Sequence, residues 1–96
     1  MKMEGTYFQK LVWTELLAIP SGEVRTYKQI AEAIGKPNAA RAVANACAAN
    51  PYAPLVPCHR VIRSDGTVGG YSSYGGVERK LDLLGKEGFL PLRSKQ

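Results

Sequence analysis

The sequence predicts a small, mainly α-helical single domain with a helix-turn-helix of winged-helix type, a minor β-hairpin and a C-terminal helix behind a cysteine. The 96 residues can form one modest hydrophobic core and no second module. Apolar residues recur at helical spacing in three segments, and an alanine-rich stretch supplies a further helix. Asp65 and Gly66 form a turn signal between the short segments 61–63 and 67–68, which predicts the hairpin.

The first two helices are predicted from the spacing of threonine and glutamine. Thr6 precedes Gln9 by three residues, as in a capping box, and apolar residues then recur at helical spacing as far as residues 20–22. Thr26 and Gln29 repeat this spacing further along the chain. The sequence therefore predicts a first amphipathic helix and a second, shorter one.

A third helix is predicted over residues 39–50. Gly35 is placed to cap the second helix, Pro37 tightens the connection, and Asn38 is placed as the next N-cap. Two helices joined by so short a turn are typical of a helix-turn-helix, in which the second helix lies against DNA. The alanines of the third helix permit close approach to a backbone or a narrow groove, although they would also serve close packing in a core.

The rest of the chain is predicted to hold Cys58 between irregular segments and a final helix. Three prolines make residues 50–57 an extended, stiff connection. The glycine-rich loop at 69–76 brings amide groups close to a ligand or serves as a flexible connector. Residues 77–87 form the final helix, which a glycine ends, and the tail at 89–96 is expected to be loosely held.

Charge and composition limit the partners. A net charge of +5 and a pI near 9.4 favour a polyanionic partner such as nucleic acid, although many basic domains are merely soluble. The chain is 45% hydrophobic and 22% charged. No apolar run approaches the roughly 20 residues that span a bilayer, which argues against membrane insertion. The first residues lack a signal-peptide core, so we expect a cytosolic protein with reduced thiols.

Cys58 stands beside the only histidine of the chain and is the strongest candidate for chemistry. A thiol becomes nucleophilic as a thiolate, and its sequence neighbours His59 and Arg60 are expected to lower its pKa. His59 is also the only imidazole available as a proton acceptor, and Glu87 is a candidate to orient it if the fold brings the two together. The alternative is a buried thiol beside a structural histidine.

Neither a disulfide nor a metal site is predicted. Cys47 lies in the alanine-rich helix, and reduced thiols argue against a bridge to Cys58. Two cysteines and one histidine, with Cys58 and His59 adjacent, lack the ligand spacing of a tetrahedral zinc site. We therefore expect no metal and no cofactor.

Several of these motifs occur together in one known family. Residues 57–61 read Pro-Cys-His-Arg-Val, with Arg41-Ala42-Val43 and Asn50-Pro51 before them and Gly70-Tyr71 after them. This pattern closely resembles the C-terminal domain of the O6-alkylguanine-DNA alkyltransferases, over about residues 6–88. The resemblance implies direct, irreversible DNA repair, in which the alkyl group on guanine O6 passes to the sulfur of the cysteine and each molecule acts once.

The resemblance also implies roles for the residues around the cysteine. Cys58 would be the acceptor, and His59 would act on it as a base through a water molecule. Glu87 would hold His59, and Asn50 would brace the active-site segment. An alkylguanine pocket is implied at Tyr27, Val61, Tyr71 and Ser72.

On the DNA side, the resemblance implies that Tyr27 crowds the target phosphate and contacts the extruded base, while Arg41 enters the base stack in its place. Extrusion costs only a few kcal/mol and is necessary because a buried O6 atom cannot meet a protein thiolate. The expected partner is double-stranded DNA, bound by a monomer from the minor groove with little sequence specificity. The residues implied to contact DNA are Tyr27, Ala39, Ala40, Arg41, Ala42, Asn45 and Ser64.

Three other functions remain open from the sequence. Alkyltransferase-like proteins bind lesions and flag them for another pathway, but they have another residue, often tryptophan, where this chain has Cys58. A transcription regulator would need base-reading side chains that the third helix mostly lacks. A thiol hydrolase would need an oxyanion site, for which only the glycine loop is available. The segment Ser72-Ser73-Tyr74 is longer than the family's usual pattern, so the alkyl-group preference is left open.

Overall fold

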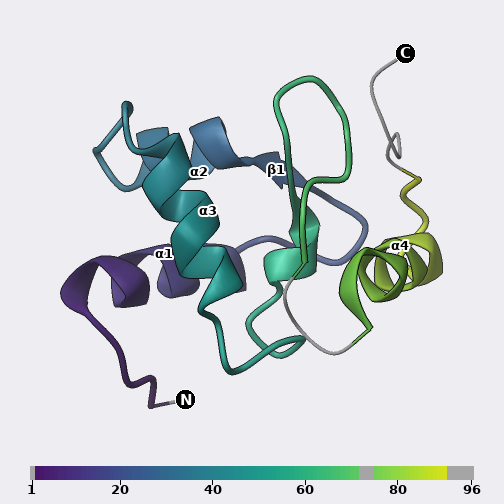
Figure 1. The fold of residues 1–96 in the computed structure, drawn as a ribbon, viewed down its shortest axis with the longest axis horizontal. Helices are drawn as coiled ribbons and strands as arrows, with labels where there is room; N and C mark the ends of the chain where they lie inside the picture. Colours follow the sequence, from purple (N-terminus) through teal and green to yellow (C-terminus); the bar gives the residue numbers. More distant parts are fainter. Residues whose placement is uncertain (1, 72–74, 91–96) are drawn as a thin grey trace.

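The structure is a computed structural model that describes residues 2–71 and 75–90, and its chain forms a mainly helical domain (Figure 1). Within these residues the elements follow in the order α1 (Tyr7–Leu17), β1 (Arg25–Thr26), α2 (Tyr27–Ala33), α3 (Ala40–Ala48), the 3-10 turn η1 (Cys58–Arg60), β2 (Val61–Ile62) and α4 (Gly76–Lys86). The predicted fold class is confirmed.

The helices form two groups with the cysteine-bearing turn between them. Helices α1, α2 and α3 pack against one another, and α4 packs against η1 on the opposite side (Figure 1). No helix of the described chain is long and apolar enough to cross a membrane. This arrangement places η1 where both helical groups can contribute side chains to it.

Both predicted capping boxes form. The Thr6 hydroxyl accepts the Gln9 amide at 3.0 Å, and the Gln9 side chain accepts the Thr6 amide at 2.9 Å. Thr26 and Gln29 form the same pair of bonds, at 3.0 Å and 2.9 Å. These bonds satisfy amides that the first turn of each helix leaves without a partner, so the starts of α1 and α2 are set locally.

The predicted third helix is too long, because α3 begins one residue later and ends two residues earlier than the predicted range 39–50. Ala39, and not Asn38, is the N-cap, and no side chain caps α3. The Ala39 amide instead donates to the Lys36 carbonyl at 2.9 Å. This bond closes a turn that contains Asn38, which therefore precedes the capping position.

The predicted hairpin forms its turn but not its expected ladder. The Gly66 amide donates to the Arg63 carbonyl at 3.0 Å, and the Arg63 amide donates to the Thr67 carbonyl at 3.1 Å. Strand β2, however, pairs in parallel with β1, with Arg25 opposite Val61. Both residues of β2 are buried, so pairing with β1 satisfies backbone groups that the core would otherwise leave without partners.

The core lies between α1, α3 and the segment before η1. Trp13, 1% exposed, donates from Nε1 to the Ala46 carbonyl at 2.9 Å and meets the Tyr52 ring edge-on at a centroid distance of 5.7 Å. Around it the buried core contains Val12, Leu16, Ile19, Ile30, Ala31, Val43, Ala46, Cys47, Val56, Cys58 and Val61. The candidate nucleophile Cys58 is thus itself a residue of the hydrophobic core.

Replacing Trp13 with phenylalanine is expected to lower the free energy of unfolding by about 1–3 kcal/mol, because it leaves the Ala46 carbonyl without its donor and opens a void beside Tyr52. Urea unfolding followed by circular dichroism measures the change. Tyr7→Phe is the control, because Tyr7 is 76% exposed, and its unfolding midpoint should stay unchanged. Equal midpoints for wild type and Trp13→Phe would contradict this account.

Candidate active site and nucleic-acid interface

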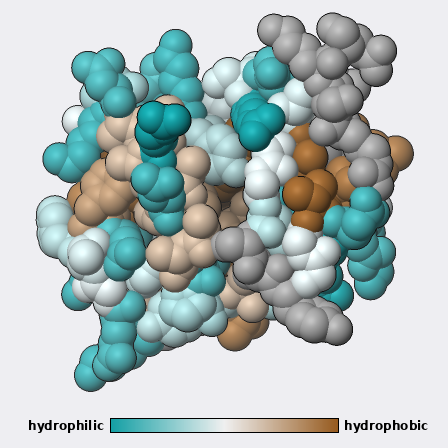
Figure 2. Space-filling view, viewed as in Figure 1, coloured by the Kyte–Doolittle hydropathy of each residue, from teal (hydrophilic) through white to brown (hydrophobic). Residues whose placement is uncertain are grey.

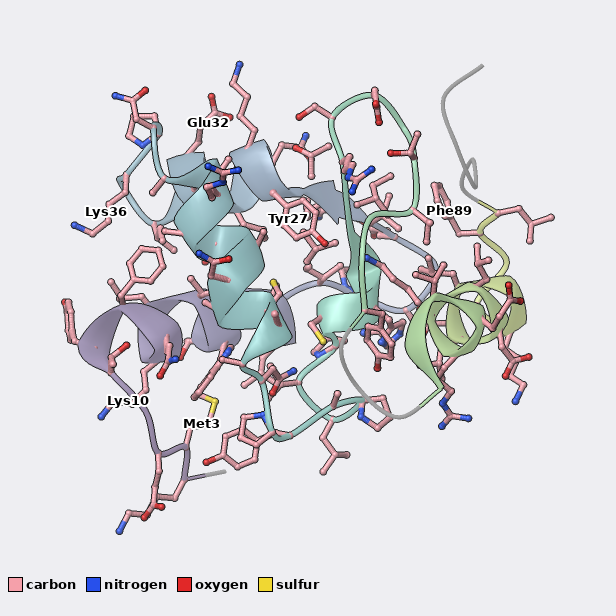
Figure 3. All side chains as sticks on the ribbon, viewed as in Figure 1. Met3, Lys10, Tyr27, Glu32, Lys36 and Phe89 are labelled. Carbon is pink, nitrogen blue, oxygen red and sulfur yellow. The ribbon has the colours of Figure 1, made fainter. Side chains whose placement is uncertain are left out.

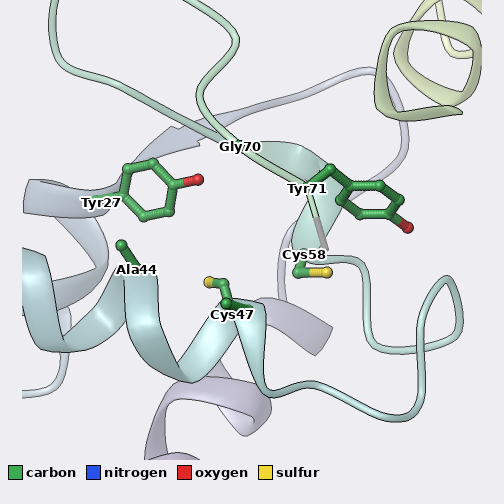
Figure 4. A pocket seen from close by; sticks show the side chains of 7 residues that line it. Tyr27, Ala44, Cys47, Cys58, Gly70 and Tyr71 are labelled. Atoms are coloured by element: carbon green, nitrogen blue, oxygen red, sulfur yellow. The ribbon is translucent and has the colours of Figure 1, made fainter. Parts of the chain in front are cut away.

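A cavity of about 270 Å³ opens beside Cys58 (Figure 4). Its wall combines the start of α2, the end of α3, η1 and the segment that follows β2. Cys58 itself is only 4% exposed. The lining residues are Tyr27, Ala44, Cys47, Ala48, Cys58, Gly70 and Tyr71. The predicted pocket residues Tyr27 and Tyr71 therefore meet at one cavity with the candidate nucleophile.

Two other predicted pocket residues are not placed there. Val61 is fully buried within β2 and is absent from the cavity wall. Its side chain belongs to the buried core. Ser72 lies outside the described residues, as do Ser73 and Tyr74.

The segment before Cys58 is compact and not extended as predicted. Residues 51–55 form consecutive turns, and the Ala53–Pro54 peptide bond is cis. Asn50, buried at the end of α3, donates from Nδ2 to the Val56 carbonyl at 2.8 Å, and its Oδ1 accepts the Tyr52 amide at 2.9 Å. Asn50 thus joins the two ends of the segment through its side-chain amide.

Burial raises the pKa of the Cys58 thiol, contrary to the prediction from its sequence neighbours. A hydrogen bond from Asn50 and the charge of Lys80 act in the opposite direction without overcoming the desolvation. The Arg60 side chain does not serve Cys58, because its guanidinium bonds to Glu87. The free protein therefore holds a protonated thiol that needs a base to become a nucleophile.

Glu87, the C-cap of α4, binds both His59 and Arg60. Its Oε2 lies 3.0 Å from His59 Nε2, while Arg60 donates from Nε to Oε1 at 2.9 Å and from Nη2 to Oε2 at 2.7 Å. Arg60 also donates from Nη1 to the Ile19 carbonyl at 2.8 Å. Hydrogen bonds from Arg60, with a smaller contribution from His59, lower the pKa of Glu87 to about 2. The predicted approach of Glu87 to His59 is present in the structure.

The bond to Glu87 sets the tautomer of His59. An ionised carboxylate only accepts hydrogen bonds, so His59 Nε2 carries the proton and Nδ1 of the neutral ring is a proton acceptor. Burial lowers the pKa of His59, in opposition to Glu87, and this favours the neutral ring. Nδ1 is buried and has no hydrogen-bond partner among the residues described. It is therefore available to take a proton.

A second, basic groove of about 440 Å³ adjoins the cavity. It shares Tyr27, Ala44 and Gly70 with the cavity and adds three cationic side chains, those of Lys28, Arg41 and Arg63. None of these three forms an ion pair with a carboxylate among the described residues. Its remaining lining residues are Ala40 and Ser64. An unneutralised basic groove of this kind suits phosphate.

Of the residues predicted to contact DNA, Tyr27, Ala40, Arg41 and Ser64 line this groove, whereas Ala39, Ala42 and Asn45 do not. Arg41, Ala42, Asn45 and Ser64 are exposed, whereas Ala39 and Ala40 are half-buried. In Figure 2 pale brown, apolar residues lie over α3 with hydrophilic side chains around them, and Figure 3 shows Tyr27 beside that helix. The structure thus brings Tyr27, Arg41 and Ser64 to one groove.

Sequence analysis missed two residues near the cavity. Cys47 lines it, and burial raises the pKa of that thiol to about 12. Lys80 is fully buried, although it was not singled out. Its spacing from Val77 and Leu84, three and four residues away, places it on the apolar face of α4 and was a signal for its burial. Cys47 and Cys58 are both free thiols, and no metal-binding cluster occurs within the described residues.

The sequence profile of the 6-O-methylguanine DNA methyltransferase DNA-binding domain matches residues 7–89. The chain belongs to this family. A curated relative, the methylated-DNA--protein-cysteine methyltransferase of Salmonella typhimurium, is 54% identical over 88 residues, which are 92% of this chain and 50% of the relative. The chain spans about half the length of such relatives and 24% of longer ones.

Solved structures of this family have the same fold as the chain. Mycobacterium tuberculosis OGT in complex with DNA matches 90% of this chain and 52% of its own, with 52% identity and a TM-score of 0.86. Atl1 of S. pombe, in complex with damaged DNA containing O6-carboxymethylguanine, matches 90% of this chain and 80% of its own, with 37% identity and a TM-score of 0.77.

The low pKa of Glu87 predicts a specific acid dependence of stability in this methyltransferase-family domain. Its folded pKa of about 2 lies below the ordinary value of 4.5, so its ionised form contributes stability that is present above 4.5 and is lost as the pH falls toward 2. In Glu87→Gln the free energy of unfolding should no longer fall between pH 4.5 and 2 on account of this group. At about pH 7 the free energy of unfolding of the variant should be roughly 1–3 kcal/mol lower than that of wild type.

Urea unfolding at several pH values between about 7 and 2.5 measures this dependence. Asp82→Asn is the matched control, because its ion pair with Lys86 is exposed and contributes little. If wild type and Glu87→Gln lose stability in parallel below pH 4.5, Glu87 does not hold the folded chain together as described.

Proposed function

We propose that this chain is the C-terminal acceptor domain of an O6-alkylguanine-DNA alkyltransferase, with residues 1–96 folding as one unit. It would remove the alkyl group from guanine O6 in DNA and keep it on Cys58. The single observation that carries this proposal is the cavity that Cys58 lines, next in the chain to a neutral His59 held by Glu87. Family membership and the named relatives support the same reaction class.

The reaction would need no cofactor. His59 Nδ1 would accept the thiol proton of Cys58, directly or through one water molecule, and Glu87 would stabilise the imidazolium that forms. The thiolate would attack the alkyl carbon, so that a carbon–sulfur bond forms as the bond from carbon to guanine O6 breaks. The proton would pass to the guanine, which leaves unmodified guanine and a stable thioether. Because no step cleaves the thioether, each molecule would act once.

Access to O6 would require the nucleotide to leave the base stack. The cavity lies beside the basic groove, so DNA bound along Lys28, Arg41 and Arg63 would present an extruded base to Cys58. The small residues of α3 would permit approach through the minor groove of double-stranded DNA with little sequence preference. We propose that the protein acts in this way as a cytosolic monomer.

Incubation with a duplex that contains one O6-methylguanine tests the proposal. Intact-protein mass spectrometry should show a stoichiometric gain of one methyl group, and the undamaged duplex and Cys58→Ala should show none. Cys47 and Cys58 lie in one tryptic peptide, residues 42–60, so fragmentation must assign the site. Tight binding of the damaged duplex without an adduct would instead support a lesion-binding protein.

Arg41→Ala tests the extrusion step. If Arg41 occupies the gap that the base leaves, its loss should slow methyl transfer from duplex DNA by about tenfold, since 1.4 kcal/mol corresponds to that factor. Transfer from free O6-methylguanine base should be unchanged, because no stack has to open. Quenched-flow assays of both substrates make the comparison, and Lys36→Ala, exposed and outside the groove, is the control. An equal loss on both substrates would contradict the role of Arg41.

The lesion-binding alternative has one observation in its favour. Atl1, which was solved with damaged DNA containing O6-carboxymethylguanine, shares the fold of this chain with a TM-score of 0.77 and 37% identity. The presence of Cys58 in the cavity wall weighs against it, because a binding-only protein has no need of an acceptor thiol with a base beside it.

A further inference from the structure

Lys80 is a fully buried cation that the reaction outlined above does not use. It extends from α4 and, with Trp13, is among the largest side chains that are completely enclosed. Burial of an ammonium group costs several kcal/mol unless opposite charge and hydrogen bonds compensate it. A lysine in this position therefore requires a physical explanation.

The Lys80 ammonium group lies behind the wall of the cavity. Nζ donates to the Gly70 carbonyl at 3.2 Å and to the Tyr27 hydroxyl at 3.4 Å, and it lies 5.7 Å from the centre of the Tyr27 ring. Gly69 makes this approach possible: it has φ of +74°, and a Cβ there would lie 3.1 Å from the Tyr27 hydroxyl oxygen. Tyr27 and Gly70 both line the cavity with Cys58 (Figure 4).

Neutral oxygens alone do not balance the charge of Lys80. No carboxylate of residues 2–71 or 75–90 forms an ion pair with it. The titratable groups whose charges act on it are Cys47 of α3, Cys58 of η1 and Arg63 after β2. The charge of Lys80 also acts on His59, which is neutral, and the Tyr27 hydroxyl accepts a hydrogen bond from it. Of these, Arg63 is cationic, and the phenol pKa of Tyr27 is raised by burial. The two thiols are therefore the groups that can supply negative charge.

We propose that Lys80 is the buried positive charge that stabilises the thiolate of Cys58, and that the same ammonium group positions the Tyr27 hydroxyl in the cavity wall. Lys80 is thus a positioning residue and not a catalytic one. The inference rests on the proposed function only in its choice of Cys58 as the reacting thiol. It gives α4 a second connection to the site, separate from Glu87.

The electrostatics of the two thiols favour ionisation at Cys58. Burial raises the pKa of both, and Lys80 opposes that rise at both. Only Cys58 also receives hydrogen bonds, from Asn50 and from its own backbone amide. A thiolate at one position disfavours ionisation of the other, so only the thiol that ionises first forms an ion pair with Lys80. Burial in turn lowers the pKa of Lys80 to about 8, and the thiols counteract that decrease.

The other charged side chains near Cys58 bind elsewhere or lie at the exposed groove. His59 and Arg60, its neighbours in η1, bind Glu87. Arg63 follows β2 at the exposed groove. Lys80 is therefore the cation whose removal should change the titration of Cys58 most directly.

Alkylation of the folded protein by iodoacetamide tests the proposal without DNA. The carbon–sulfur bond forms as iodide leaves, the thiol proton goes to solvent, and the rate follows the thiolate population. Lys80→Gln and Lys80→Met should move the pH–rate profile of Cys58 to higher pH, which lowers the rate at neutral pH about tenfold for each unit moved. Lys80→Arg, which keeps the charge, should stay nearer to wild type.

Lys86→Gln is the matched control, because Lys86 is exposed on the same helix. Lys80→Gln loses the charge and keeps hydrogen-bond donors on a shorter side chain, and Lys80→Met loses both, so the two variants together separate the charge from the hydrogen bonds. Unchanged Cys58 profiles in folded Lys80→Gln would overturn the proposal. A shifted profile in a protein that fails to demethylate DNA would support the role of Lys80 and refute the proposed function instead.

A second measurement needs no change at Lys80. By linkage, a thiolate that is stabilised by Lys80 must raise the pKa of Lys80 by the same interaction. An NMR titration of the Lys80 side chain should show titration at higher pH in Cys58→Asp, whose carboxylate carries the negative charge of a thiolate, than in Cys58→Ser. Identical titrations in two folded proteins would overturn the proposal.

Discussion

The ion pair between Arg60 and Glu87 is the interaction on which the site depends. It joins the end of α4 to η1, and its third bond, from Arg60 to the Ile19 carbonyl, extends the connection to the segment after α1. Because Arg60 keeps Glu87 ionised, Glu87 can only accept from His59 and so determines which ring nitrogen is free. A bond between charged groups thus sets the protonation state of a neutral one.

The site combines two demands that oppose each other. Enclosure of Cys58 in the core excludes water but disfavours its thiolate. Helix α4 offsets this cost with two side chains. Glu87, its C-cap, prepares His59 as a base, and Lys80, earlier in the same helix, supplies positive charge. The helix at the back of the cavity is therefore an electrostatic element as much as a packing element.

Sequence analysis predicted the elements that depend on near neighbours. The capping boxes at Thr6 and Thr26 form because each bond spans three residues. The turn at Gly66 also forms locally. The partner of β2, in contrast, is β1, which lies more than thirty residues earlier. The burial of Val61 and Ile62, and not the turn, decides that pairing. No local sequence pattern predicts which strand will lie beside β2 in the folded chain.

By itself, the sequence determined the helices, the adjacent Cys58 and His59, and the excess of positive charge, because these follow from spacing and composition. Only the tertiary structure decided that Arg60 serves Glu87 and not Cys58, that burial outweighs nearby charge at the thiol, and that Lys80 lies behind Tyr27. The physical reason is that a pKa depends on desolvation and on charges within a few ångströms. Those charges come from residues that are distant in the chain and are brought together by packing.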